Sequence, residues 1–221
     1  MNIAIIGMGI SGLTAAWQLY REHQLTLFEA NDYIGGHTHT VDVAVGGRSY
    51  AVDTGFIVFN DWTYPNFIDL LDQLGVASQP TLMSFSVRCE RTGLEYNGEN
   101  LNTLFAQRRN LFRPSFHRMI RDILRFNREA PALLDSPRAV TLNVYLREQN
   151  YSQEFIDHYI LPMAAAIWSA EPAVTGEMPV RFFVQFFRNH GLLSVSDRPQ
   201  WRVVQGGSRR YVERLTAPFH D

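Results

Sequence analysis

The sequence contains no lysine, because all 20 of its basic residues are arginines. This excludes a Schiff-base lysine, a P-loop lysine and a lysine general base from these 221 residues. Cysteine is almost as scarce. The single Cys89 excludes an internal disulfide and a cysteine-based zinc site, and it fits a reducing cytoplasm as the location of the protein.

Neither an excess of one charge nor a long apolar run is present. The 20 basic and 22 acidic residues leave a formal net charge of -2, which provides no general attraction for nucleic acid or an anionic membrane. The apolar stretch over residues 160–168 is interrupted by Pro162 and is far shorter than the ~20 residues of a spanning helix. We therefore expect a soluble protein with no nucleic-acid partner and no transmembrane segment.

The first thirty residues have the pattern of a strand, a helix and a second strand. Residues 2–6 form an apolar run that ends in glycine, which is typical of a buried parallel strand. Apolar residues at helical spacing predict a helix over 10–21, and residues 24–29 predict another strand. The short connection implies that the two strands are parallel, with a right-handed crossover.

The rest of the chain alternates between hairpins and helices, with most of the helices in its second half. The patterns predict a hairpin over 41–45 and 49–52, a helix over 64–74, two strands within 84–96, helices over 115–128, 141–149, 152–161 and 180–190, a strand over 201–204, and a helix over 208–215.

A G-x-G-x-x-G motif, Gly7-Met8-Gly9-Ile10-Ser11-Gly12, lies between the first strand and the first helix. In such a motif the glycines allow a tight turn, close approach of a pyrophosphate, and close packing of helix on strand. The helix N-terminus then offers free N–H groups to the phosphates. Glu29 ends the second strand, where an acid would accept hydrogen bonds from a ribose diol. The motif predicts dinucleotide binding; the alternative is an ordinary glycine-rich turn.

The segments that follow carry a family resemblance. Residues 29–40, EANDYIGGHTHT, resemble the E-A-x(4)-G-G-x-x-x-T extension of the FAD-dependent amine oxidoreductases, a superfamily that includes monoamine oxidases, phytoene desaturases and protoporphyrinogen oxidases. Residues 53–56 resemble the family segment beside the isoalloxazine ring, and residues 201–208 resemble its return strand and glycine pair. His37 departs from the arginine that is frequent after the first glycine pair, but it can still donate a hydrogen bond.

The resemblance is closer to a bacterial subgroup of NAD/FAD-binding, amine-oxidase-like proteins, through residues 35–40, 52–60 and 161–168. It implies an α/β fold: a Rossmann-like FAD-binding domain from residues 1–60 and 199–221, with a mixed α+β, largely helical substrate domain inserted at 61–198. Because family members are longer, we expect an N-terminal portion of a larger flavoprotein, without the C-terminal part of the fold.

The implied cofactor is FAD, and no metal is implied. The residues expected to contact FAD are Gly7, Gly9, Ile10, Ser11, Gly12, Glu29, Ala30, Gly35, Gly36, His37, Thr38 and Gly55. The resemblance implies oxidation of a C–N or C–C bond in an amine or an apolar, lipid-like or polyene-like small molecule by hydride transfer to flavin N5. The sequence identifies no catalytic acid or base. A non-redox flavin isomerase or mutase, an NAD(P)-binding dehydrogenase domain, and a non-catalytic dinucleotide-binding fragment remain alternatives.

Three further patterns each have two interpretations. Phe182, Phe183, Phe186 and Phe187 fit one helix face, which forms either a core or an apolar substrate tunnel. His37 and His39, with Asp42 and Asp53 nearby, could hold a metal, although phosphate binding explains the glycine-rich segment better. The helical stripe of basic residues is either a solvated face or a peripheral surface for anionic headgroups or a partner; it comprises Arg118, Arg121, Arg125 and Arg128.

Overall fold

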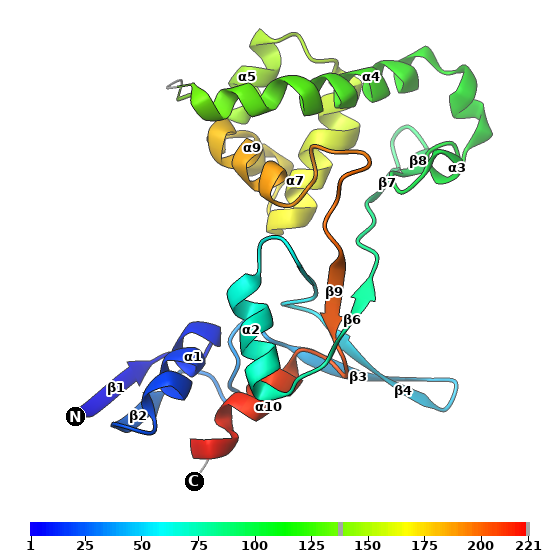
Figure 1. The fold of residues 1–221 in the computed structure, drawn as a ribbon. Coiled ribbons are helices and arrows are strands. Elements are labelled where there is room, and N and C mark those ends of the chain that lie inside the picture. The colour runs from blue at the N-terminus through cyan, green and yellow to red at the C-terminus, as the bar shows by residue number, and fades with distance from the viewer. Residues whose placement is uncertain (137–138, 220–221) are drawn as a thin grey trace. The chain divides into compact units, whose positions relative to one another are not determined.

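The computed structural model describes residues 1–136 and 139–219. They form two compact units (Figure 1). Unit 1 consists of Met1–Leu82 and the segment from Gln200 onward, and unit 2 consists of Met83–Pro199. Within the described residues, no helix has both the length and the apolar character needed to cross a membrane.

The described residues of unit 1 form short sheets and three α-helices. Its elements are β1 (Asn2–Ile6), α1 (Ile10–Leu19), β2 (Gln24–Phe28), β3 (Thr40–Val45), β4 (Arg48–Asp53), β5 (Phe59–Asn60), α2 (Pro65–Leu74), β6 (Ser78–Thr81), β9 (Trp201–Val204), α10 (Arg209–Thr216) and the 3₁₀ turn η4 (Ala217–Phe219).

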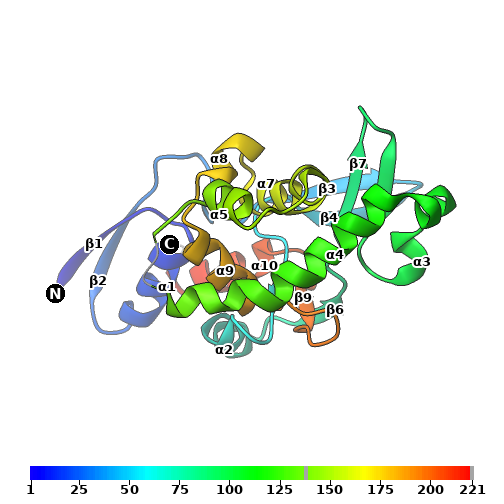
Figure 2. The same ribbon diagram turned by 90° about the horizontal axis from the view of Figure 1, so that it is seen from above.

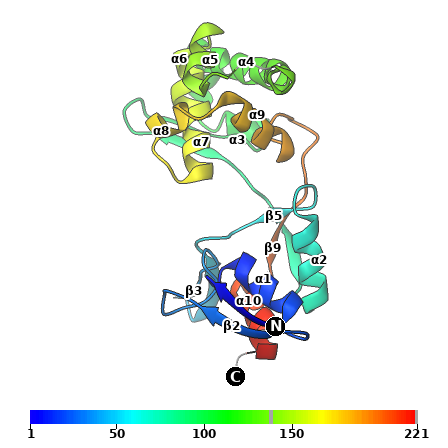
Figure 3. The same cartoon turned by 90° about the vertical axis from the view of Figure 1, so that its left-hand side faces the viewer.

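The strands β1 and β2 are parallel neighbours joined through α1, as the sequence predicts (Figure 3). Ile3 pairs with Leu25 and Ile5 with Leu27 in this two-stranded sheet. The prediction that β1 is buried is wrong, because its side chains alternate between partly buried and exposed. Ile3 and Ile5 of β1 lie on the covered side of the sheet, as does Leu13 of α1, whereas Ile6 is 89% exposed on the other side of the sheet.

Turns in unit 1 form where the glycine pattern predicts them. Gly46 and Gly47 have φ angles of 57° and 77° and connect β3 to β4 as an antiparallel hairpin. Such positive φ values are strained for residues with a Cβ atom. Gly75 ends α2 with φ 63°, and its N–H donates to the carbonyl oxygen of Asp72.

A three-stranded sheet joins the two chain segments that make up unit 1. The strand β9 lies between β5 and β6 and is antiparallel to both. Figure 1 shows β9 beside β6. The sequence pattern missed β6, because Pro80 disfavours a strand. The first boundary between units follows Leu82, later than the expected residue 60, because β6 pairs with β9 and because α2 shares an apolar core with α1 and α10.

Unit 2 is mostly helical. Its elements are β7 (Ser86–Cys89), β8 (Leu94–Asn97), α3 (Leu101–Leu104), η1 (Arg108–Phe112), α4 (Pro114–Glu129), η2 (Ala130–Asp135), α5 (Leu142–Glu148), α6 (Gln153–Phe155), the π-helix η3 (Ile156–Ile160), α7 (Leu161–Trp168), α8 (Pro172–Gly176) and α9 (Val180–Asn189).

The core of unit 2 is built from aromatic and aliphatic side chains of these helices. The helices α4, α5 and α9 are seen from above in Figure 2. The longest of them, α4, buries Phe126 against Phe183 of α9 and Tyr151 after α5. Phe183 and Phe187 of α9 are buried and stack on each other with ring centroids 4.1 Å apart, as a core face requires. Phe182, on the same helix, is 52% exposed. The expected single phenylalanine face is therefore divided between core and surface.

Candidate cofactor-binding site

The first glycine motif forms the turn between β1 and α1. Gly7 has φ 91°, and its N–H donates to the carbonyl oxygen of Phe28 at 2.8 Å. A Cβ atom on Gly12 would lie 1.9 Å from the Gly7 carbonyl oxygen, so only glycine allows the helix to pack this close to the turn. Helix α1 begins at Ile10 with no side-chain cap at Gly9. Its first-turn N–H groups, including those of Ser11 and Gly12, therefore have no intrahelical partner.

The Glu29 carboxylate lies against this turn. Its Oε2 atom accepts the Met8 N–H at 2.8 Å, and its Oε1 atom accepts the N–H groups of Ala30 and Asn31 at 2.8 and 3.0 Å. The hydrogen bonds from Asn31 and Met8 lower the pKa of the Glu29 carboxyl below its ordinary value. This carboxylate remains ionised at neutral pH, and Oε2 still has a lone pair for another donor.

The second glycine pair packs directly beside the first motif. The Gly35 N–H donates to the Met8 carbonyl oxygen at 2.9 Å, and Gly9 and Gly35 form a parallel bridge. A Cβ atom on Gly36 would lie 2.9 Å from the Gly9 Cα atom. Two glycine segments that are far apart in the sequence therefore form a continuous backbone surface at the start of α1.

The residues after the glycine pair are held by the segment that follows β4 and by α10. The His37 carbonyl oxygen accepts the Phe56 N–H at 3.0 Å, and a Cβ atom on Gly55 would lie 1.9 Å from it. Thr38 is buried, with its hydroxyl bonded to the Tyr211 hydroxyl of α10. The residues expected to contact the cofactor thus form one connected part of unit 1. They are the glycine motif, Glu29, Ala30, Gly35, Gly36, His37, Thr38 and Gly55.

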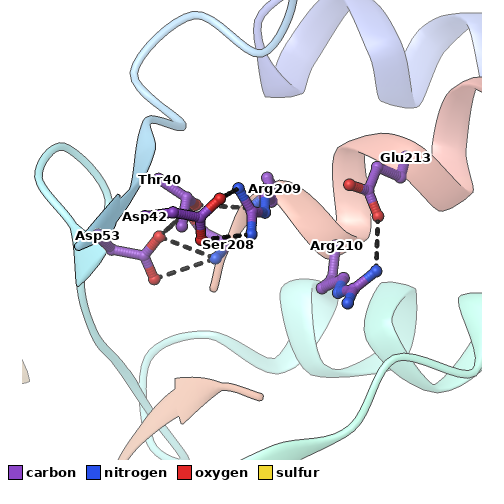
Figure 4. A network of polar contacts seen from close by, with 7 residues as sticks. All are labelled: Thr40, Asp42, Asp53, Ser208, Arg209, Arg210 and Glu213. Carbon is purple, nitrogen blue, oxygen red and sulfur yellow. Dashed lines mark hydrogen bonds and ion pairs between the residues drawn. The ribbon is translucent and has the colours of Figure 1, made fainter. Parts of the chain in front are cut away.

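Asp53 anchors a polar network that sequence reasoning missed (Figure 4). Its carboxylate accepts the Ser208 N–H at 2.9 and 3.0 Å and the hydroxyl groups of Ser208 and Thr40 at 2.7 and 2.6 Å. Thr40 in turn accepts the Arg209 N–H at 3.0 Å. The network fixes the N-terminus of α10 to the β3–β4 hairpin. The polar residue types at 40, 53 and 208 were visible in the sequence, but Ser208 is more than 150 residues from the other two, so no local signal of the contact exists.

Asp42, Asp53 and His39, three of the four residues considered for a metal site, have other side-chain partners. Asp53 belongs to the network above, and both oxygens of Asp42 accept the Arg209 guanidinium at 2.7 Å. His39 Nδ1 lies 2.6 Å from the Thr54 hydroxyl. His37 and His39 precede β3, so they do not share one face of a strand. Across residues 1–136 and 139–219, no group of three His, Cys, Asp or Glu side chains is placed to hold a metal ion.

The basic stripe lies on α4 and lines a cleft of about 580 Å³ with Leu124, Asn150 and Ser152. Arg125 pairs with Glu129 at 3.0 Å, as the helical spacing predicts. Arg118 instead pairs with Glu154 at 2.9 Å. This second pairing is between residues 36 positions apart, which a local spacing argument does not reveal.

Comparison with proteins of known sequence gives partial matches to a desaturase and a monooxygenase. The chain is 45% identical over 71 residues to the 1-hydroxycarotenoid 3,4-desaturase of Flavobacterium sp. (strain P99-3). It is 38% identical over 80 residues to the probable flavin-containing monooxygenase 1 of Arabidopsis thaliana. These matches cover 32% and 33% of this chain but only 13% and 15% of the two relatives.

Solved structures with the same fold match nearly the whole chain. Cyclohexylamine oxidase from Brevibacterium oxydans IH-35A aligns with a TM-score of 0.68 at 20% identity, over 98% of this chain and 49% of the oxidase. A single-residue variant of putrescine oxidase aligns with a TM-score of 0.64 at 20% identity, over 100% and 49%. The chain thus spans about half the length of these structures.

The sequence profile described as "Flavin containing amine oxidoreductase" matches residues 10–220. FAD is the cofactor that this match and the oxidase fold imply. The chain belongs to the flavin-containing amine oxidoreductase family.

Proposed function

We propose that unit 1 is a Rossmann-like FAD-binding domain and that its two glycine segments hold the cofactor diphosphate. The parallel arrangement of β1 and β2 supports this assignment, as does the position of Gly36 beside Gly9 at the start of α1. The glycines place no Cβ atoms on this backbone surface, and the first-turn N–H groups of α1 are suitable donors for phosphate oxygens. The backbone of His37 and Thr38 continues from this surface, with the Thr38 side chain buried beneath it. Gly55 is proposed as a contact of the isoalloxazine ring.

Glu29 is proposed to bind the adenosine ribose. The single observation that carries the proposal is the 2.8 Å hydrogen bond from the Met8 N–H to Glu29 Oε2, since it fixes the carboxylate at the glycine turn. The lowered pKa of Glu29 keeps it an acceptor at neutral pH. An ionised carboxylate accepts hydrogen bonds only, which suits the two hydroxyl donors of a ribose diol.

The proposed reaction is the oxidation of a C–N or C–C bond of an amine or apolar small molecule. FAD, when bound, supplies the hydride-accepting chemistry at N5. The residues of this chain then bind and orient cofactor and substrate, and they need not provide a nucleophile. The absence of lysine means that any lysine-dependent step depends on residues outside these 221.

Unit 2 is proposed as the substrate domain. Trp168 packs against Phe182 and Phe186 with ring centroids 6.0 and 4.8 Å apart. Because Phe182 is half-exposed, this aromatic cluster offers an apolar surface that Phe183 and Phe187, buried in the core, cannot offer. The cluster suits an apolar substrate better than a small charged one. A cytoplasmic location remains a proposal that rests on the single, unpaired Cys89.

The test is titration of the purified protein with FAD and, separately, with NADH, followed by flavin or nicotinamide fluorescence. We expect saturable FAD binding that excess NADH does not displace, and weaker FAD binding by Glu29→Gln. The loss of a hydrogen bond to a charged group corresponds to about tenfold in affinity. Binding of NADH in preference to FAD would assign the site to a dehydrogenase domain instead.

A further inference from the structure

We propose that the arginine cleft on α4 binds the phosphate group of an organic phosphoester, a second ligand unrelated to the FAD site. The arginine cleft is the hollow of about 580 Å³ in unit 2 that is lined by Arg118, Arg121, Asp122, Leu124, Arg125, Arg128, Asn150 and Ser152. Its volume lies in the range of small-molecule binding sites.

The charges around the arginine cleft do not cancel. Four guanidinium groups face three carboxylates, those of Asp122, Glu129 and Glu154, which leaves one positive charge in excess. The excess lies at Arg121. Its guanidinium is exposed and has no hydrogen-bond or ion-pair partner in the part of the chain that the structure describes.

The neighbouring arginines are already held in position. Glu154 holds Arg118 at 2.9 Å, and Glu129 holds both Arg125 at 3.0 Å and Arg128 at 2.8 Å. Arg125 also lies over the Tyr151 ring, 4.2 Å from its centroid. The side chains of Arg118 and Arg128 are 50% and 73% exposed, whereas that of Arg125 is 28% exposed. An anion that enters the arginine cleft therefore meets in Arg125 a guanidinium whose conformation is restrained, which reduces the side-chain entropy lost on binding.

Two neutral donors complete the binding surface opposite α4. Asn150 has φ 52°, and its exposed side-chain amide makes no hydrogen bond within the described residues. The Ser152 oxygen accepts the Phe155 N–H at 3.4 Å, which leaves its hydroxyl hydrogen available. The Asp122 carboxylate does not compete as a free anion at this surface, because it is buried and accepts the Ser152 N–H at 2.9 Å.

The set of unused groups consists of donors, and it fits a ligand with several acceptor oxygens. Arginine guanidinium groups bind phosphate oxygens in a bidentate manner, and a phosphate offers more acceptors than a carboxylate. Leu124 lies among these donors with 52% of its side chain exposed. An apolar side chain there favours a phosphate carried on an organic group over the inorganic ion. A soluble phosphoester and a phospholipid headgroup share this chemistry.

The test compares phenyl phosphate with benzoate, which has the same ring on a carboxylate, by isothermal titration of the full 221-residue chain. We expect phenyl phosphate to bind more tightly than benzoate, with an affinity that falls as salt is added. Arg121→Gln should weaken phenyl phosphate binding about tenfold. Arg181→Gln removes one exposed helical arginine of the same unit outside the arginine cleft and should leave binding unchanged.

Arg121→Lys keeps the charge and loses the bidentate geometry, so an intermediate affinity is expected. Co-sedimentation with phosphatidylcholine vesicles, with and without phosphatidic acid, separates the two sources of phosphate. Binding to the acidic vesicles that is lost in Arg121→Gln identifies a headgroup, whereas binding of phenyl phosphate alone identifies a soluble ligand. No binding to any probe, tighter binding of benzoate, or equal effects of Arg121→Gln and Arg181→Gln would overturn the proposal. Circular dichroism of each variant checks that it is folded.

Discussion

Glu29 and Met8 are joined by a 2.8 Å hydrogen bond across 21 residues of sequence, from the Met8 N–H to Glu29 Oε2. The bond ties the end of β2 to the glycine turn after β1. It also makes folding sensitive to the ionisation of Glu29, because the hydrogen bonds from Asn31 and Met8 lower the pKa of this carboxyl in the folded state.

A pH dependence follows from this lowered pKa. A carboxyl whose pKa is lowered in the folded state stabilises that state at pH values above its ordinary pKa, which is about 4.3 for Glu. This stabilisation is lost as the pH falls through the lowered pKa. We expect the wild type to melt above Glu29→Gln at pH 7 and the difference to vanish in the acid range. Thermal melts of both proteins between pH 7 and pH 3 check this. A difference that grows on acidification would contradict it.

Replacement of Gly55 by alanine should be severely destabilising. The new Cβ atom would lie 1.9 Å from the His37 carbonyl oxygen, so the backbone must move. We expect a loss of about 2–3 kcal/mol in the free energy of unfolding, measured by urea denaturation. Gly98→Ala is the matched control, since its nearest atom, the Phe85 carbonyl oxygen, would be 3.7 Å away. The control should change stability by no more than about 1 kcal/mol.

Asp53→Asn tests the network at the start of α10. The substitution keeps the size of the side chain but removes the charge that accepts the N–H and hydroxyl of Ser208 and the hydroxyl of Thr40. We expect a loss of about 1.5–3 kcal/mol. Asp42→Asn removes an exposed ion pair with Arg209 and should cost much less stability than Asp53→Asn. Comparable losses in the two variants would show that the network contributes no more than a surface pair.

A pair of variants distinguishes the two interpretations of the phenylalanine residues in α9, which are a core face and an apolar substrate tunnel. Phe183 is fully buried, so Phe183→Ala should cost about 3–5 kcal/mol in stability. Phe182 is 52% exposed, so Phe182→Ala should cost much less. If Phe182 instead contacts substrate, its replacement raises KM for an apolar substrate while the melting temperature stays close to that of the wild type. Equal losses of stability would place both residues in the core.

The parts of the fold that sequence predicted are those set by local patterns. The β1–α1–β2 unit follows from an apolar run, a glycine motif and a helical periodicity, and the β3–β4 hairpin follows from Gly46 and Gly47. The resemblance of residues 35–40 identified the second glycine pair, but it did not reveal that Gly35 bonds to Met8.

The parts that sequence missed depend on contacts between distant segments. Pro80 hides the strand β6, which forms because β9 pairs with it from the other end of unit 1. Asp53 bonds to Ser208 across 155 residues, and no periodicity encodes such a pair. Exposure of Ile6 was missed because an apolar run indicates burial only when both faces of the sheet are covered.

The most direct test of the central claim is an FAD titration of the wild type, Gly36→Ala and Gly46→Ala. Both glycines have similar φ angles, 62° and 57°, but a Cβ atom on Gly36 would lie 2.9 Å from Gly9 Cα, whereas one on Gly46 would meet nothing within 4 Å. If the two glycine segments hold the FAD diphosphate, Gly36→Ala loses FAD affinity by at least about tenfold, and Gly46→Ala binds like the wild type. Unchanged FAD affinity in a folded Gly36→Ala protein would contradict the account.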